Sequence, residues 1–136
     1  GEPERTRQGF FQSSARPRAL PARFRYREAL EQIEGHLQNG DGAHLRLAII
    51  EADKLLDDTL KMRGCDGETV AARLDNLEGG GISSASKQLL GEARRLRNRI
   101  VHESEFIVKP EHVKAALRAY RRALNDLGIE WGSEFI

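Results

Sequence analysis

Residues 43–63, AHLRLAIIEADKLLDDTLKMR, decide the fold of this chain of 136 residues. Their apolar side chains recur every three or four positions, which is the period of an α-helix with one face turned toward a core. Because this stretch is the longest and most apolar in the chain, we expect its helix to lie at the centre of the domain. The predicted core stripe consists of Leu45, Ala48, Ile49, Ala52, Leu55, Leu56 and Leu60.

The flanking segments follow the same period. A preceding helix is predicted from about Ala22, with Tyr26, Leu30, Ile33 and Leu37 on one face, and Asn39-Gly40-Asp41-Gly42 ends it. After residue 63, Thr69 can cap a short helix that ends at Gly79-Gly80-Gly81. That helix carries Val70, Leu74 and Leu77.

Two more helices complete the chain. Ser83 or Ser84 can cap the first, whose predicted core stripe is Leu89, Ala93, Leu96 and Ile100. Pro110 suits the first turn of the second, and Gly128 followed by Ile129 suits its C-terminal cap. Four long helices and one short helix joined by brief loops predict an all-α fold, an up-down antiparallel bundle.

The expected bundle occupies residues 22–128, between two different ends. Residues 1–21 are basic and contain prolines, which favours a flexible lead-in; two interpretations stay open, a solvated linker or a segment just inside a membrane, cut from a longer parent. Residues 129–136 form a C-terminal tail, in which Gly132-Ser133-Glu134-Phe135 resembles the translation of two adjacent cloning sites. We expect Trp131 to pack on the end of the bundle.

The composition limits the classes of function. With a formal net charge of +1, the chain does not coat nucleic acid by charge alone, so any contact with RNA must be local. Cys65 is the single cysteine, which excludes a disulfide framework and a cysteine metal cluster and favours a reducing, cytoplasmic setting. No stretch approaches the roughly 20 apolar residues that span a bilayer.

One segment combines residue types that are suited to catalysis: Arg97-Asn98-Arg99-Ile100-Val101-His102. A histidine can take a proton from a ribose 2′-hydroxyl or return one to the leaving oxygen, and an arginine can hold the phosphate and its developing charge. That chemistry requires no metal and no cofactor. The segment therefore predicts a candidate site for cleaving RNA.

An arginine, a polar residue, three further residues and a histidine resemble the R-x4-6-H signature of HEPN domains. The position of the signature, near the end of a late helix and before a loop and a final helix, resembles that family too, over roughly residues 24–127. The resemblance implies a homodimer in which two copies of the motif form one site for metal-independent endonucleolytic cleavage of RNA. It implies Arg97 and His102 as the catalytic pair, with Asn98 as the accompanying polar residue.

A helical wheel indicates which face of the helix carries the motif, independently of the resemblance to the family. Relative to Leu89, Asn98 lies near 180° and His102 near 220°, on an outer stripe that is turned away from the predicted core. Arg97 lies about 140° from His102, so the two side chains do not converge on a regular helix. We expect this outer surface to bind substrate or to form a dimer seam. The residues assigned to this surface are Lys87, Gly91, Arg94 and Arg95. Glu103 is added from the resemblance to the family, on weaker grounds.

Plainer interpretations compete with the catalytic one. Arg97 can pair with Glu51, Asp53 or Asp57, and a histidine near a helix C-terminus can serve the helix dipole. The carboxylates of the segment EADKLLDD are expected on the solvated side of their helix. The remaining histidines lack metal-ligand spacing and are expected to be isolated surface residues: His36, His44 and His112.

Three functions therefore stay open. The first is a dimeric ribonuclease, in the manner of a toxin or a defence or stress factor, with an antitoxin or a regulatory protein as partner. The second is a non-catalytic module that binds RNA, a nucleotide or a protein. The third is the cytosolic part of a membrane-attached protein, whose basic lead-in would lie against anionic lipid.

Overall fold

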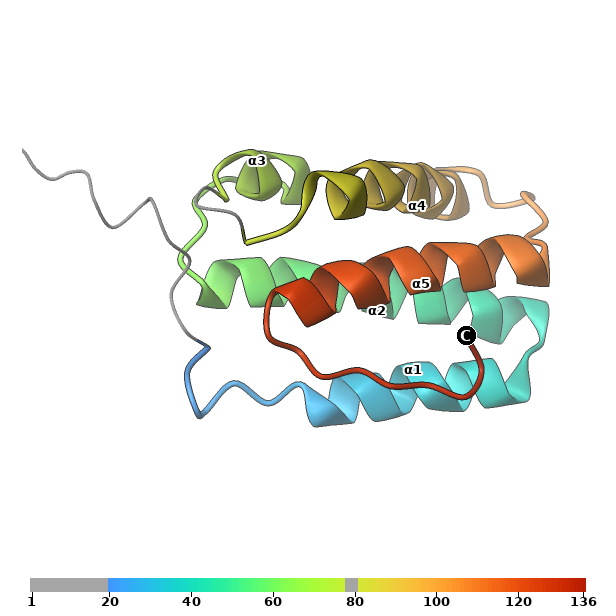
Figure 1. Cartoon of the computed structure of the whole chain (residues 1–136). Helices are drawn as coiled ribbons and strands as arrows, with labels where there is room; N and C mark the ends of the chain where they lie inside the picture. Colours follow the sequence, from blue (N-terminus) through green and yellow to red (C-terminus); the bar gives the residue numbers. More distant parts are fainter. Residues whose placement is uncertain (1–19, 78–80) are drawn as a thin grey trace, which may run out of the picture.

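The computed structural model describes residues 20–77 and 81–136, and within them the chain is all-α, as predicted. Most of the predicted lead-in and most of the glycine run lie outside the described residues. Within these residues the helices are four long ones and one short one, drawn in Figure 1. Their order is α1 (Arg27–Asn39), α2 (Gly42–Met62), α3 (Val70–Asp75), α4 (Ser84–His102) and α5 (Pro110–Asp126). None of these helices is long and apolar enough to cross a membrane.

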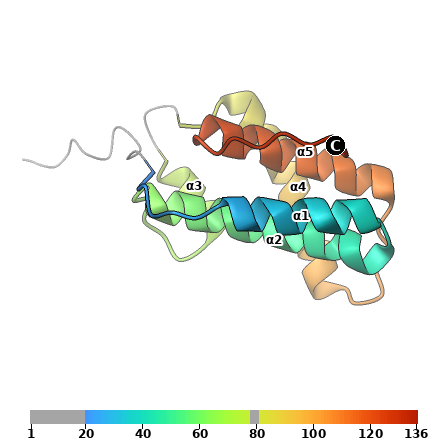
Figure 2. The same cartoon turned by 90° about the horizontal axis from the view of Figure 1, so that it is seen from below.

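The central helix is α2, in agreement with the pattern of residues 43–63. It packs against all four other helices, antiparallel to α1 along its length. Figure 2 shows that α4 lies obliquely across α2 and α5 rather than alongside them. Every residue of the predicted α2 stripe is buried, which makes α2 the element on which the core is built.

Most predicted helix ends are confirmed by their caps. The side chains of Asp41, Thr69 and Ser83 each accept a hydrogen bond from a backbone N–H three residues further on, at 2.8–3.1 Å. Ser83, rather than Ser84, is therefore the cap of α4. The start of the first helix was predicted too early, because residues 21–24 form a turn in which the N–H of Phe24 bonds to the carbonyl of Pro21.

The end of α5 is a Schellman motif, as Gly128 and Ile129 predict. Gly128 has φ +97°, and the N–H of Ile129 donates to the carbonyl of Leu124 at 2.9 Å. The chain then turns back and runs beside α1 and α5 (Figure 1). Trp131 is buried, so it packs on the bundle as expected, although along α1 rather than over the end.

The predicted core face of α4 is confirmed at Ala93 and Ile100 and in part at Leu96, but it is wrong at Leu89. Leu89 is 41% exposed, whereas Leu90 is buried. The inward line consists of Ser86, Leu90, Ala93, Arg97 and Ile100, and two of its five members are polar. Both polar side chains face inward because they have partners on other helices. Ser86 donates to Asp126 of α5 at 2.9 Å, and Arg97 pairs with Asp53 of α2.

Candidate functional site

Arg97, the arginine of the motif, points into the bundle. Its Nε lies 3.4 Å from Oδ2 of Asp53 on α2, and its Nη1 donates to the side chain of Asn98 at 3.1 Å. The side chain of Arg97 remains 29% exposed, so part of the guanidinium still faces solvent. Pairing with Asp53 is one of the plainer interpretations of this residue, and the structure confirms that contact.

Asp53 is the centre of a polar cluster inside the core. Oδ1 of its carboxylate accepts hydrogen bonds from Nε of Arg94 at 2.9 Å and from the hydroxyl of Tyr120 at 2.8 Å. The expectation that this carboxylate is solvated is wrong, because only 4% of Asp53 is exposed. Two hydrogen-bond donors, one on α4 and one on α5, and the nearby positive charge of Arg97 compensate for the lost water. Such compensation is the condition under which a charge can be buried.

The pKa values of Tyr120 and Arg94 are both raised by their surroundings. Burial, helped by the charge of Asp53, raises the pKa of Tyr120 far above its ordinary value, so this phenol is a neutral donor. Burial is the largest single influence on Arg94 and acts to lower its pKa, but the hydrogen bond to Asp53 and the attraction of nearby negative charge together outweigh it and leave that pKa raised. Arg94 and Arg97 are therefore cations that share one anion, which leaves positive charge at this part of α4.

His102, the other predicted catalytic residue, is exposed at the last position of α4. Within residues 20–77 and 81–136, its imidazole has no hydrogen bond or ion pair with another side chain. Arg97 and His102 of one chain therefore do not converge, as the helical wheel predicts. Glu103 is held away in an ion pair with Arg99, at 3.2 Å, and Arg99 stacks on Phe106.

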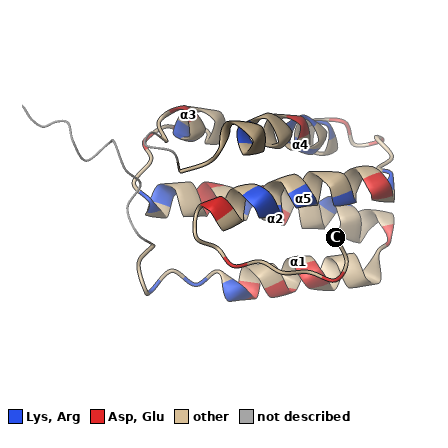
Figure 3. Cartoon of the chain, in the orientation of Figure 1, with Lys and Arg blue, Asp and Glu red and all other residues tan. Residues whose placement is uncertain are grey.

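The outer stripe of α4 is polar and open, as predicted. Gly91, Arg95, Asn98 and His102 follow one another at helical spacing, and all four are exposed. A side chain added at Gly91 would meet no heavy atom within 4 Å. Figure 3 shows that lysine and arginine positions recur along this helix.

The stripe borders a groove of about 300 Å³ between α3 and α4. These two helices do not pack directly against each other, although both pack on α2. Five of the predicted site residues line this groove, whereas Arg97, His102 and Glu103 do not. The α4 side consists of Lys87, Gly91, Arg94, Arg95 and Asn98, and the α3 side of Ala71, Leu74 and Asp75.

Asp53, the partner of both arginines, and Tyr120, which donates to the same carboxylate, were missed as site residues. Their contacts join residues 41 and 67 positions apart, which no local pattern encodes. A usable signal is nonetheless present. Asp53 falls between Ile49 and Leu56 at the spacing of buried positions, and Arg97 falls between Ala93 and Ile100 in the same way. Opposite charges at core positions of two helices predict a buried pair.

The predicted isolation of the other histidines is wrong for two of them. His36 and His44 lie side by side, with ring centroids 5.2 Å apart, where the end of α1 meets the start of α2. Nε2 of His36 lies 3.0 Å from Glu51, and Nδ1 of His44 lies 2.8 Å from the cap residue Asp41. His112 is exposed on α5.

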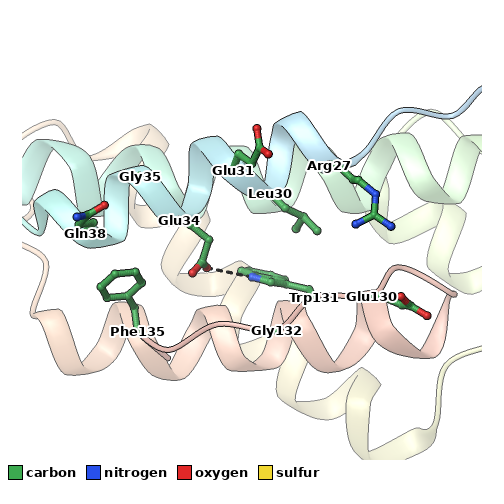
Figure 4. Close-up of a pocket in the computed structure, with 10 residues that line it drawn as sticks. All are labelled: Arg27, Leu30, Glu31, Glu34, Gly35, Gln38, Glu130, Trp131, Gly132 and Phe135. Atoms are coloured by element: carbon green, nitrogen blue, oxygen red, sulfur yellow. Dashed lines mark hydrogen bonds between the residues drawn. The ribbon is translucent and has the colours of Figure 1, made fainter.

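A second groove, of about 500 Å³, lies between α1 and the tail (Figure 4). Its carboxylates come from Glu31, Glu34 and Glu130, against one cation, Arg27. Glu34 already accepts hydrogen bonds from the indole of Trp131 at 3.1 Å and from Ser133 at 2.8 Å. An acidic lining repels phosphate, so this groove is a poor candidate for binding RNA.

No family model, curated protein or solved structure matches this chain. The likeness to HEPN domains therefore depends on the residues of α4 and on the order of the helices around them.

Proposed function

We propose that this domain is a metal-independent endoribonuclease of the HEPN type, whose site forms where two copies bring their α4 helices together. The single observation that carries the proposal is the exposed imidazole of His102, one helical turn beyond the Arg97–Asn98 pair. A proton acceptor that faces solvent is available to substrate, whereas one that is engaged inside the bundle is not.

The reaction needs two proton transfers. One histidine removes the proton of a ribose 2′-hydroxyl as its oxygen attacks the adjacent phosphorus. A second acid protonates the departing 5′-oxygen, so the products are a 2′,3′-cyclic phosphate and a 5′-hydroxyl. One imidazole cannot take up and deliver a proton in the same step, and a two-fold seam supplies a second copy of His102.

A cleavage assay with a matched control tests this function. Purified protein is incubated with a single-stranded RNA transcript and excess EDTA, and the product ends are identified. We expect cleavage that persists with the chelator, and a loss of at least about hundredfold in His102→Ala, because general acid–base groups contribute about 10²–10⁴-fold. His112→Ala, which removes another exposed histidine, should cleave within about twofold of the unmodified chain.

Three results would contradict the proposal: no cleavage of any RNA, cleavage that EDTA abolishes, or equal rates for His102→Ala and His112→Ala.

One observation favours a second function, a module that binds RNA without cutting it. Arg97 is paired with the buried carboxylate of Asp53, which accounts for this arginine by stability alone. Such a module would bind the transcript and release it intact, and His102→Ala would not change its affinity. The same assay distinguishes the two functions, since only the nuclease generates new ends.

A further inference from the structure

We propose that the groove between α3 and α4 binds one nucleotide of a single-stranded RNA and directs the strand along α4 toward His102. This inference rests on the proposed function in that both take RNA as the ligand. It adds a binding site at a stated place, outside the catalytic motif.

The charge of the groove suits a phosphate. Lys87, Arg94 and Arg95 contribute three cations, and Asp75 contributes the one anion in the lining. The Nε of Arg94 is engaged with Asp53, which fixes the guanidinium in place and leaves its other N–H groups to bind a ligand. Arginine binds phosphate through paired hydrogen bonds, and a held arginine loses less entropy when it does so.

The shape of the groove suits a nucleoside. A volume of about 300 Å³ lies at the lower end of the range for small-ligand sites. Ala71 and Leu74 of α3 provide an apolar wall against which a base can lie, as apolar side chains do in other sites that bind an unpaired base. Asn98 offers an amide for the edge of the base, and Asp75 can accept a hydrogen bond from a 2′-hydroxyl.

The direction of the strand follows from the helix. Lys87 and His102 are 15 residues apart in the sequence, which corresponds to about 22 Å along α4. That length accommodates several nucleotides of a single strand. Arg95 and Asn98, which line the groove, are exposed, and Asn98 is one helical turn from His102, so the polar surface of the groove extends to the histidine.

Gly91 offers a sharp test because the space beside it is empty. Gly91→Met adds a side chain that enters the groove without meeting another atom in its first position. Gly35 of α1 is the matched control, since it is also an exposed helical glycine with nothing within 4 Å of an added Cβ. Both substitutions favour the helix, because methionine has the higher helix propensity.

The experiment measures the affinity for a fluorescein-labelled oligouridylate by anisotropy, with His102→Ala present in every protein so that the RNA stays intact. We expect Gly91→Met to bind about tenfold more weakly, because a base contact is worth about that much, and Gly35→Met to bind as before. Arg95→Glu should weaken binding and reduce the salt dependence by about 0.7 in slope, the value of one lost phosphate contact to a single strand. Arg118→Glu, on the exposed side of α5, is its control.

Each result has one meaning. Unchanged affinity in both Gly91→Met and Arg95→Glu would overturn the site even if the protein cleaves RNA. Groove-dependent binding without cleavage would support the site and contradict the nuclease. DNA of matching sequence should bind more weakly, and equal affinity would overturn the assignment to RNA. A protein that binds no oligonucleotide would overturn the site, whereas the nuclease is judged separately by the cleavage assay.

Discussion

Asp53 occupies a core position of α2, where Ile49 and Leu56, one helical turn away on either side, are apolar and fully buried. Its carboxylate is surrounded by Arg94, Arg97 and Tyr120, so three helices meet at one anion. Such a cluster stabilises the fold only while every member is present, because the loss of one partner leaves charges without compensation. The cluster therefore links the stability of the bundle to the orientation of the motif arginine.

We expect Asp53→Ala to lower the free energy of unfolding by about 3 kcal/mol, the lower end of the range for a broken buried pair, because both arginines stay partly exposed. Asp58→Ala is the control, since its ion pair with Lys54 is at the surface, where such pairs contribute about 0–1 kcal/mol. Urea unfolding followed by circular dichroism measures both. Equal effects of the two substitutions would show that the buried cluster contributes no more to the free energy of unfolding than a surface ion pair does.

The same contacts decide how an Arg97 variant is to be interpreted. Arg97→Ala removes a partner of Asp53, so a loss of activity could come from the fold rather than from the reaction. His102 has no such role within the described residues, which makes it the cleaner position for a kinetic test.

Helix α4 shows which features of an element can be predicted from its own sequence. A cap at Ser83 or Ser84 and the first-turn Pro110 of α5 were predicted, because caps depend on residues within one turn; the structure decides for Ser83. Its inward face was predicted only in part, because partners on α2 and α5 hold the polar side chains of Arg97 and Ser86 on that side. The outer stripe is nevertheless exposed as predicted. Its residues lie on the side of α4 away from both the predicted and the observed core residues: Gly91, Arg95, Asn98 and His102.

The cap of α4 gives a prediction at the scale of the helix. Ser83 accepts from the N–H of Ser86 and donates to its hydroxyl, which in turn donates to Asp126 at the end of α5. We expect Ser83→Ala to destabilise the domain by about 1 kcal/mol, the usual value of a lost N-cap. Ser84→Ala, one position further on, should be neutral or slightly stabilising because alanine favours the helix. A thermal melt of each variant measures the difference, and the reverse order would contradict the assigned cap.

At the scale of the whole molecule, the groove could not be predicted as a cavity. Lys87, Arg94 and Arg95 were chosen for their chemistry and their place on α4, and the structure collects them beside α3. The opposite wall, with Leu74 and Asp75, depends on how α3 and α4 each pack on α2. Long-range packing of this kind is not encoded by the period of either helix.

The composite site predicts how mixed populations behave. If each active centre uses His102 from two copies, a wild-type chain paired with a His102→Ala chain is inactive. In an equal mixture that has exchanged subunits, activity per wild-type chain should fall to about half, because about half of the wild-type chains then have an inactive partner. Addition of His112→Ala instead should leave activity per chain unchanged. A monomer by light scattering, or activity that follows simple dilution, would contradict the composite site.

The bond between Trp131 and Glu34 has a practical consequence. Trp131 is the only tryptophan in the chain, and its buried indole lies in the tail rather than in a helix. Its fluorescence therefore reports whether the tail is docked on α1, while far-ultraviolet circular dichroism reports the helices. Two spectroscopic signals from one unlabelled protein can thus separate release of the tail from unfolding of the bundle.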